Sequence, residues 1–127
     1  MTSTWTEAEL QTIDADDEVV LTSRKHDGSP SSPATIWVVR VGDEVFVRSA
    51  YGPGNRWYAR ATEAGDGHVT VGDVSRDVTF VDASTGTDHA AVDAAYHAKY
   101  DAKYPKRYVD PVVDERSHAA TLRLIPA

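Results

Sequence analysis

Six short stretches of the chain carry apolar residues in patterns that are typical of β-strands. Val69, Val71, Val78 and Phe80 alternate with polar residues, and this period of two predicts strands with one buried face. The run at 34–41 is more continuously apolar and predicts a central strand. The predicted strands cover residues 18–25, 34–41, 45–48, 68–71, 76–81 and 118–125.

Short turns separate several of these strands. Gly42-Asp43 and Gly72-Asp73 predict tight hairpins, and the segment 27–30 (Asp-Gly-Ser-Pro) is a strong turn signal. Successive strands joined by short turns pair with their neighbours, so we expect an antiparallel sheet. About six strands of this length favour a small closed or nearly closed barrel.

Three segments have the signals of helices. Thr6 and Glu9 match a capping box at the start of the first, which is short, and the third is long and rich in alanine. The predicted helices cover residues 6–15, 56–64 and 88–104. The fold class expected is therefore α+β and mainly β, with two short helices and one long helix in the C-terminal half.

Tyr96, Tyr100 and Tyr104 lie on one stripe of the long predicted helix. We interpret this aromatic stripe as core or as a dimer contact, with the lining of a pocket as the alternative.

Composition narrows the function classes. The length of 127 residues fits a single domain, 1–127, and the absence of cysteine excludes disulfides, thiolate metal sites and cysteine nucleophiles. The net charge of −7 argues against binding to nucleic acid or to an anionic membrane. No signal peptide or membrane-spanning pattern is visible, so we expect a cytoplasmic protein. The five histidines are scattered, and no metal site is expected.

Two polar segments are the candidate ligand sites. In the first, 23–32, two cations and several hydroxyl groups occupy a hairpin turn and are suited to hold a phosphate. In the second, 48–58, glycines, cations and aromatic residues surround a helix start, which suits a nucleotide-like cofactor. The candidate residues are Arg24, Lys25 and Ser32 in the first segment and Arg48, Ser49, Tyr51, Asn55, Arg56 and Trp57 in the second.

The order of these motifs resembles a known group of proteins. The Arg24-Lys25 strand end, the run 33–39, the Gly42-Asp43 turn and Trp57-Tyr58 resemble the deazaflavin-dependent nitroreductases, within the pyridoxamine-phosphate-oxidase-like split barrels. The segments 35–42, 95–100 and 120–126 are similar to an uncharacterised bacterial family of about this length.

The resemblance implies a split β-barrel that forms a homodimer, with FMN or a deazaflavin in a groove near the dimer interface. It implies that Arg24 and Lys25 hold the cofactor phosphate and that the backbone of Thr35 to Trp37 faces the ring system. Such proteins pass a hydride between the ring and a small organic substrate.

Three functions therefore remain open at the level of sequence. The first is a flavin- or deazaflavin-binding reductase of a small organic substrate. The second is a split-barrel protein that binds a small ligand without redox activity. The third is a cofactor-free biosynthetic enzyme with acid–base residues in the pocket.

Overall fold

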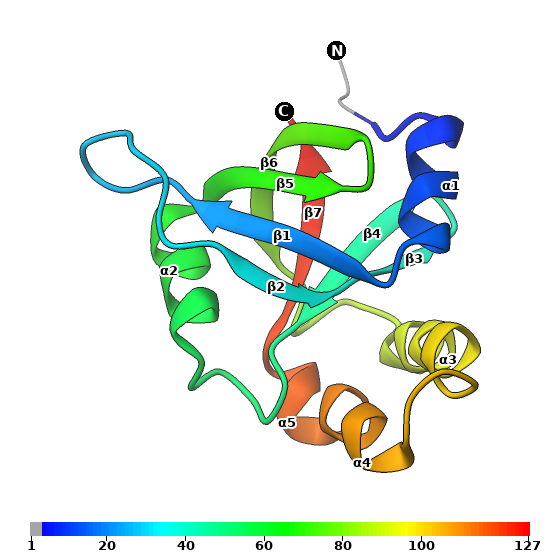
Figure 1. Cartoon of the computed structure of the whole chain (residues 1–127). Coiled ribbons are helices and arrows are strands. Elements are labelled where there is room, and N and C mark those ends of the chain that lie inside the picture. Colours follow the sequence, from blue (N-terminus) through cyan, green and yellow to red (C-terminus); the bar gives the residue numbers. More distant parts are fainter. Residues whose placement is uncertain (1–3) are drawn as a thin grey trace.

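A computed structural model describes residues 4–127, and within them the chain forms a seven-stranded sheet with helices around it (Figure 1). The strands are β1 (Glu18–Ser23), β2 (Ala34–Trp37), β3 (Val39–Val41), β4 (Glu44–Arg48), β5 (Asp66–Val71), β6 (Val74–Asp82) and β7 (Thr121–Pro126). The helices are α1 (Glu7–Ala15), α2 (Arg56–Ala64), α3 (His89–Tyr100), α4 (Lys106–Val109) and α5 (Glu115–His118), with a 3-10 turn at Asp110–Val112.

The sheet curls into a nearly closed antiparallel barrel. Its strand order is β2-β1-β5-β6-β7-β4-β3, and every pairing is antiparallel. The two edge strands, β2 and β3, follow one another in the chain and are separated only by Val38. One continuous segment therefore pairs with β1 at one end and with β4 at the other, and this brings the sheet edges together.

The predicted α+β barrel is confirmed, with a split in the strand expected at 34–41. Val38 is fully buried between β2 and β3, where the Tyr100 hydroxyl accepts a hydrogen bond from its amide (3.0 Å). The same hydroxyl lies 2.6 Å from the carbonyl oxygen of Asp17. Lys99 Nζ donates to the carbonyl oxygens of Val38 (2.7 Å) and Ile13 (2.6 Å). Side chains of α3 thus replace the strand hydrogen bonds that Val38 lacks.

The position of Lys99 gives a prediction about pH. Burial lowers the pKa of Lys99 from 10.5 to about 8, so the unfolded chain binds more protons than the folded one between these values. We expect the free energy of unfolding to gain a contribution as pH rises from 8 towards 10. Urea unfolding at pH 7.5 and 9.5 measures this gain, which Lys99→Met should remove; an equal gain in the variant would contradict it.

Two apolar clusters hold the fold together. The first fills the barrel and includes Val19, Leu21, Val47 and Leu122, which project inwards from different strands. The second lies between the outer surface of β3 and β4 and the helix α3, and includes Val39, Phe46, Val92, Tyr96 and Tyr100.

Tyr96 and Tyr100 are fully buried, so the interpretation of the tyrosine stripe as core is confirmed for these two residues. Tyr104 is only half-buried and contributes to a cavity that is described below.

The first two helices match their predictions closely. Thr6 Oγ1 accepts from the Glu9 amide (3.1 Å) and Glu9 Oε1 accepts from the Thr6 amide (2.9 Å), as in the expected capping box. The second helix begins and ends where it was predicted, and Gly65 terminates it with a positive φ of 77°.

The C-terminal third differs from the prediction. The long helix ends at Tyr100 instead of 104, and residues 101–104 form turns before Pro105, which disfavours helical backbone at Tyr104. The segment 106–118 forms short helical turns, which were not predicted because the apolar residues there show no helical spacing. The last strand begins at Thr121 instead of 118, because Asp114 caps the short helix α5 through the Ser117 amide (3.0 Å).

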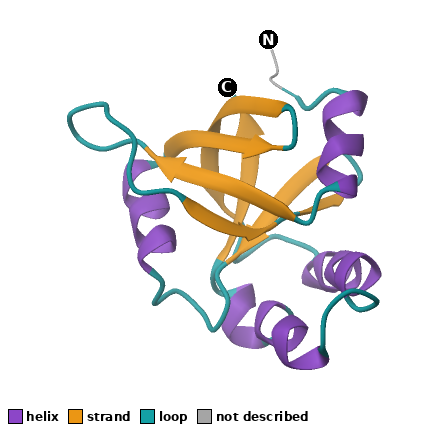
Figure 2. Ribbon diagram, in the orientation of Figure 1, coloured by secondary structure: helices purple, strands orange, loops and turns teal. Residues whose placement is uncertain are grey.

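The helices leave one part of the barrel uncovered. In the view of Figure 2, α1, α2 and α3 to α5 surround the sheet, while no helix lies in front of β1, β2 and β5. Among residues 4–127, no helix combines the length and apolar character that crossing a bilayer requires.

Candidate functional site

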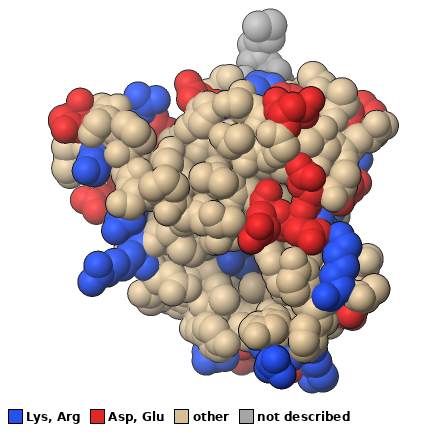
Figure 3. All heavy atoms as spheres, viewed as in Figure 1, with Lys and Arg blue, Asp and Glu red and all other residues tan. Residues whose placement is uncertain are grey.

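A cavity of about 530 Å³ lies between β2, the start of α2 and the segment 104–112, and we call it the aromatic cavity. Five of its lining residues are Trp or Tyr. Figure 3 shows a hollow on this face, where a basic side chain lies deep among uncharged residues. The lining consists of Thr35, Ile36, Trp37, Arg48, Ala50, Tyr51, Asn55, Trp57, Tyr104, Tyr108, Pro111 and Val112.

The flat wall of the aromatic cavity is held from behind by the tyrosines of the α3 segment. The Trp37 ring stacks on Tyr100 with a centroid distance of 4.1 Å and an interplanar angle of 6°. Tyr104 tilts against the same indole at 4.8 Å. These contacts fix the indole in one orientation, which favours stacking of a flat ligand.

Side-chain hydrogen bonds shape the loop that leads into α2. Asn55 Nδ2 donates to Ser49 Oγ (2.8 Å) and to the carbonyl oxygen of Ala50 (2.8 Å), while Ser49 Oγ donates to the Gly52 carbonyl (2.6 Å). The Asn55 side chain therefore makes no capping bond to α2. The first-turn amides of this helix have no side-chain cap from Asn55, and they form the positive end of the helix dipole.

Arg48 closes the inner end of the aromatic cavity and is held by a buried network. Its Nε donates to Thr121 Oγ1 (3.0 Å) and its Nη1 to the Val112 carbonyl (2.8 Å) and to the carboxylate of Asp93. Its Nη2 lies 3.0 Å from His89 Nδ1. With these four hydrogen bonds to protein groups, the guanidinium ties β4 to α3 and to the C-terminal segment.

The same network fixes the protonation of a histidine. Because an arginine can only donate, His89 Nδ1 accepts from Arg48, and His89 Nε2 then carries the proton that it donates to the Ser84 carbonyl (2.9 Å). His118 stacks on His89 at 4.5 Å and donates to Asp93 (3.0 Å). These contacts join the two histidines to the Arg48 network.

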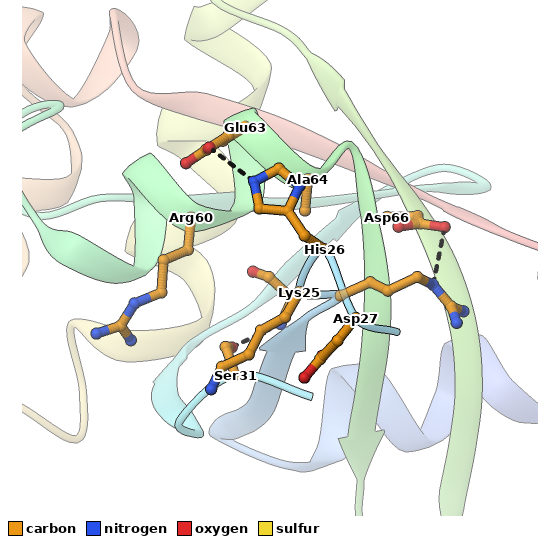
Figure 4. A pocket seen from close by; sticks show the side chains of 10 residues that line it. Lys25, His26, Asp27, Ser31, Arg60, Glu63, Ala64 and Asp66 are labelled. Carbon is orange, nitrogen blue, oxygen red and sulfur yellow. Dashed lines mark hydrogen bonds and ion pairs between the residues drawn. The ribbon is translucent and has the colours of Figure 1, made fainter. Parts of the chain in front are cut away.

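A second cavity, of about 580 Å³, lies between the hairpin that follows β1 and the last turns of α2, and we call it the hairpin cavity (Figure 4). Its lining consists of Ser23, Arg24, Lys25, His26, Asp27, Ser31, Arg60, Glu63, Ala64 and Asp66.

Four side chains in the lining of the hairpin cavity form two pairs. Arg24 Nε lies 3.2 Å from Asp66, and His26 lies 3.6 Å from Glu63. Among residues 4–127, neither Lys25 nor Arg60 has a carboxylate within 4.0 Å. These two cations are the ones that can neutralise an anionic ligand.

Helix α2 connects the two cavities. Trp57 lines the aromatic cavity, and Arg60, three residues further on, lines the hairpin cavity. Residues three apart lie on the same helix face, so the two cavities follow one another along α2. The two polar segments therefore line two neighbouring cavities of the protomer instead of a single cleft, and Lys25 and Asn55 belong to different ones.

The predicted residues divide between the two sites. Thr35, Trp37, Arg48, Tyr51, Asn55 and Trp57 line the aromatic cavity, and Arg24 and Lys25 line the hairpin cavity. Ser32 is exposed on the segment between them, Ser49 is buried in the loop, and Arg56 is exposed at the start of α2.

The sequence did not single out Arg60 or Tyr108 as site residues, and it gave the lining of a pocket only as the alternative role of Tyr104. Arg60 could have been found from its helical spacing to Trp57. Tyr108 lies in the segment after Pro105, which has no periodic pattern, and only the three-dimensional structure brings it to the cavity.

The barrel topology and the helices around it define a split-barrel protein, and comparison with known proteins gives the family. The model of the family described as "Uncharacterized protein conserved in bacteria (DUF2255)" matches residues 9–124. The chain belongs to this family, as the resemblance of its sequence indicated. A search of curated proteins finds no match to the sequence.

Solved structures share the fold at low sequence identity. The heme storage protein HutZ of Vibrio cholerae is similar with a TM-score of 0.67 and 12% identity, over 95% of this chain and 89% of that chain. A conserved hypothetical protein of Mycobacterium tuberculosis is similar with a TM-score of 0.65 and 14% identity, over 98% of this chain and 82% of that chain. A candidate pyridoxamine 5'-phosphate oxidase of Listeria innocua has a TM-score of 0.58 and 12% identity, over 92% of this chain and 89% of that chain. These identities establish the fold alone.

Proposed function

We propose that this protein binds FMN or a deazaflavin along α2 and uses it to reduce a small organic substrate. The observation that carries the proposal is that the aromatic cavity and the hairpin cavity, which contains Lys25 and Arg60, follow one another on the same side of one helix. The flat ring would stack in the aromatic cavity, and the phosphate would lie against Lys25 and Arg60. A bound flavin supplies hydride transfer, and the protein supplies placement and electrostatics.

The side chains of the two cavities suit both the ring system and the phosphate of such a cofactor. The indole of Trp37 is rigidly backed by Tyr100, and Trp57 gives a second aromatic surface in the same cavity. Lys25 and Arg60 are cations without carboxylate partners in the described part of a chain whose net charge is −7. Similar folds include proteins named for heme storage and for pyridoxamine 5'-phosphate oxidation. This similarity supports a planar ligand for this chain.

A porphyrin is the main competing ligand. Among residues 4–127, the lining of the aromatic cavity contains no histidine and no methionine, and within this part of the chain tyrosine is the one side-chain type of the lining that could ligate haem iron. This favours a flavin over a haem.

Replacing Trp57 tests the ring site. We expect Trp57→Ala to weaken FMN or deazaflavin binding by about tenfold or more, because a central aromatic anchor is lost, and Trp57→Phe to keep most of the affinity. Fluorescence titration with FMN, the deazaflavin and haemin measures this. Binding of haemin alone would overturn the proposal, and stabilisation by FMN without hydride transfer would leave a ligand-binding protein instead of a reductase.

We also propose that two copies of the chain pair through the uncovered face of the sheet. Thr35, Val20, Thr70 and Ser75 form one row across β2, β1, β5 and β6, all exposed and uncharged. Val20 is 40% exposed, which is unusual for a valine in the middle of a sheet. Figure 3 shows uncharged surface over the middle of β1, with charged side chains at its edges.

The dimer has a direct test. Val20→Glu places a charge at the centre of the row, and two such charges would face each other or be desolvated across the interface. We expect the wild-type protein to sediment as a dimer and this variant as a folded monomer. Thr79→Glu, at an exposed position of β6 that lies outside this row, serves as the control for an added surface charge. A monomeric wild-type protein would refute the dimer.

A further inference from the structure

Two exposed tyrosines stand at the mouth of the aromatic cavity. Tyr51 is 64% exposed and Tyr108 is 52% exposed, and both contribute to the cavity lining. They come from segments far apart in the sequence, which meet where the Tyr51 amide donates to the Pro111 carbonyl (3.3 Å). Large exposed aromatic rings beside a cavity are costly in solvent and typical of ligand contacts.

Each of these rings has a guanidinium group over it. Arg116 lies 5.3 Å from the centroid of the Tyr51 ring, and Arg107 lies 4.9 Å from that of Tyr108. Arg116 also pairs with Asp114 (2.9 Å), whereas no carboxylate within the described residues pairs with Arg107. The mouth therefore combines flat surfaces with positive charge in a chain that is acidic as a whole.

The backbone of Tyr51 is strained. Its φ of 67° lies in the left-handed region, and among the described residues it is the one non-glycine with a positive φ. A tyrosine in this conformation costs about 1–2 kcal/mol relative to the right-handed region, a cost that glycine avoids. A strained residue at a cavity points to a role for its side chain.

We propose that Tyr51 and Tyr108, with Arg107 and Arg116, form the substrate-binding mouth of the aromatic cavity and select a flat aromatic anion. The tyrosine rings contact the two sides of an aromatic group, and the guanidinium groups attract its carboxylate or comparable negative group. This inference rests on the proposed function, because it assigns the substrate side of the cavity whose inner part receives the cofactor ring.

The experiment is calorimetric titration of the cofactor-free protein with 2-naphthoate, its neutral amide and cyclohexanecarboxylate. We expect 2-naphthoate to bind about threefold to tenfold more tightly than either of the others, since aromatic and cation–π contacts have this magnitude. Arg107→Gln should weaken 2-naphthoate and leave 2-naphthamide unchanged. The Arg123 side chain pairs with Glu44 outside this cavity, so Arg123→Gln should leave the affinities for 2-naphthoate and 2-naphthamide unchanged.

The variant Tyr51→Gly distinguishes a role of the Tyr51 ring in ligand binding from a role in protein stability. The variant should lose about threefold to tenfold in affinity for both aromatic ligands while its melting temperature stays the same or rises, because the strain is relieved. A lower melting temperature with unchanged 2-naphthoate binding would assign the ring to structure and overturn the inference. Binding of FMN without selective binding of 2-naphthoate would also overturn it. Selective 2-naphthoate binding without FMN binding would refute the proposed cofactor instead.

Discussion

Replacing Arg48 by alanine is expected to lower the free energy of unfolding by about 3–5 kcal/mol, the usual cost of removing one partner from a buried ion pair. The Arg48 side chain is fully buried and makes four hydrogen bonds within the protein. Its loss would leave the Asp93 carboxylate without its cation and the Val112 carbonyl without a donor. Because Val112 also lines the aromatic cavity, ligand binding should weaken as well.

A matched exposed pair gives the control for this prediction. Arg123 pairs with Glu44 at 3.0 Å on the protein surface, and Arg123→Ala should cost less than about 1 kcal/mol. Guanidinium chloride unfolding of both variants measures the difference. If Arg48→Ala cost no more than Arg123→Ala, the buried network would not support the cavity wall.

The second large effect is expected at Gly67 in β5. A Cβ atom at this position would lie 2.0 Å from the Thr22 carbonyl oxygen and 3.0 Å from both Ser23 Cα and the Phe80 ring. The nearest of these atoms is backbone, so it can move only if β1 and β5 separate. We expect Gly67→Ala to cost about 3 kcal/mol or more, which is the upper part of the range for overpacked sites.

Gly54 is the matched control for Gly67. No atom of residues 4–127 lies within 4 Å of a Cβ built there, and its φ is not positive. Gly54→Ala should therefore leave the midpoint of chemical unfolding nearly unchanged, or raise it slightly because the unfolded chain loses freedom. A similar loss of stability in the two variants would show that the close approach of β1 and β5 is not tight.

The sequence predicted the fold wherever the pattern of apolar residues depends on local structure. The hairpins around Gly42 and Gly72 and the helix 56–64 are in this class, since turn chemistry and helical spacing act over a few residues. The break at Val38 could not be predicted from local pattern, because the Tyr100 hydroxyl that stabilises it is 62 residues away.

In the candidate site, too, local features could be predicted from the sequence and long-range contacts could not. Trp57 and Asn55 could be expected beside a ligand because a glycine-rich loop led into a helix there. The neighbourhood of Arg48 could not, because His89, Asp93 and Thr121 reach it only through the packing of α3 and β7 against β4. The strain at Tyr51 is equally invisible in sequence, since a positive φ at tyrosine has no signature in the residue itself.

The proposed function requires one ligand to be held in both the aromatic cavity and the hairpin cavity, and the affinity ratio of FMN to riboflavin measures this most directly. The wild-type protein should bind FMN at least about tenfold more tightly than riboflavin, because only FMN carries a phosphate for Lys25 and Arg60. In the variant with Lys25→Ala and Arg60→Ala, the two affinities should converge on that of riboflavin. Equal affinities in the wild-type protein, or binding of neither molecule, would contradict the proposal.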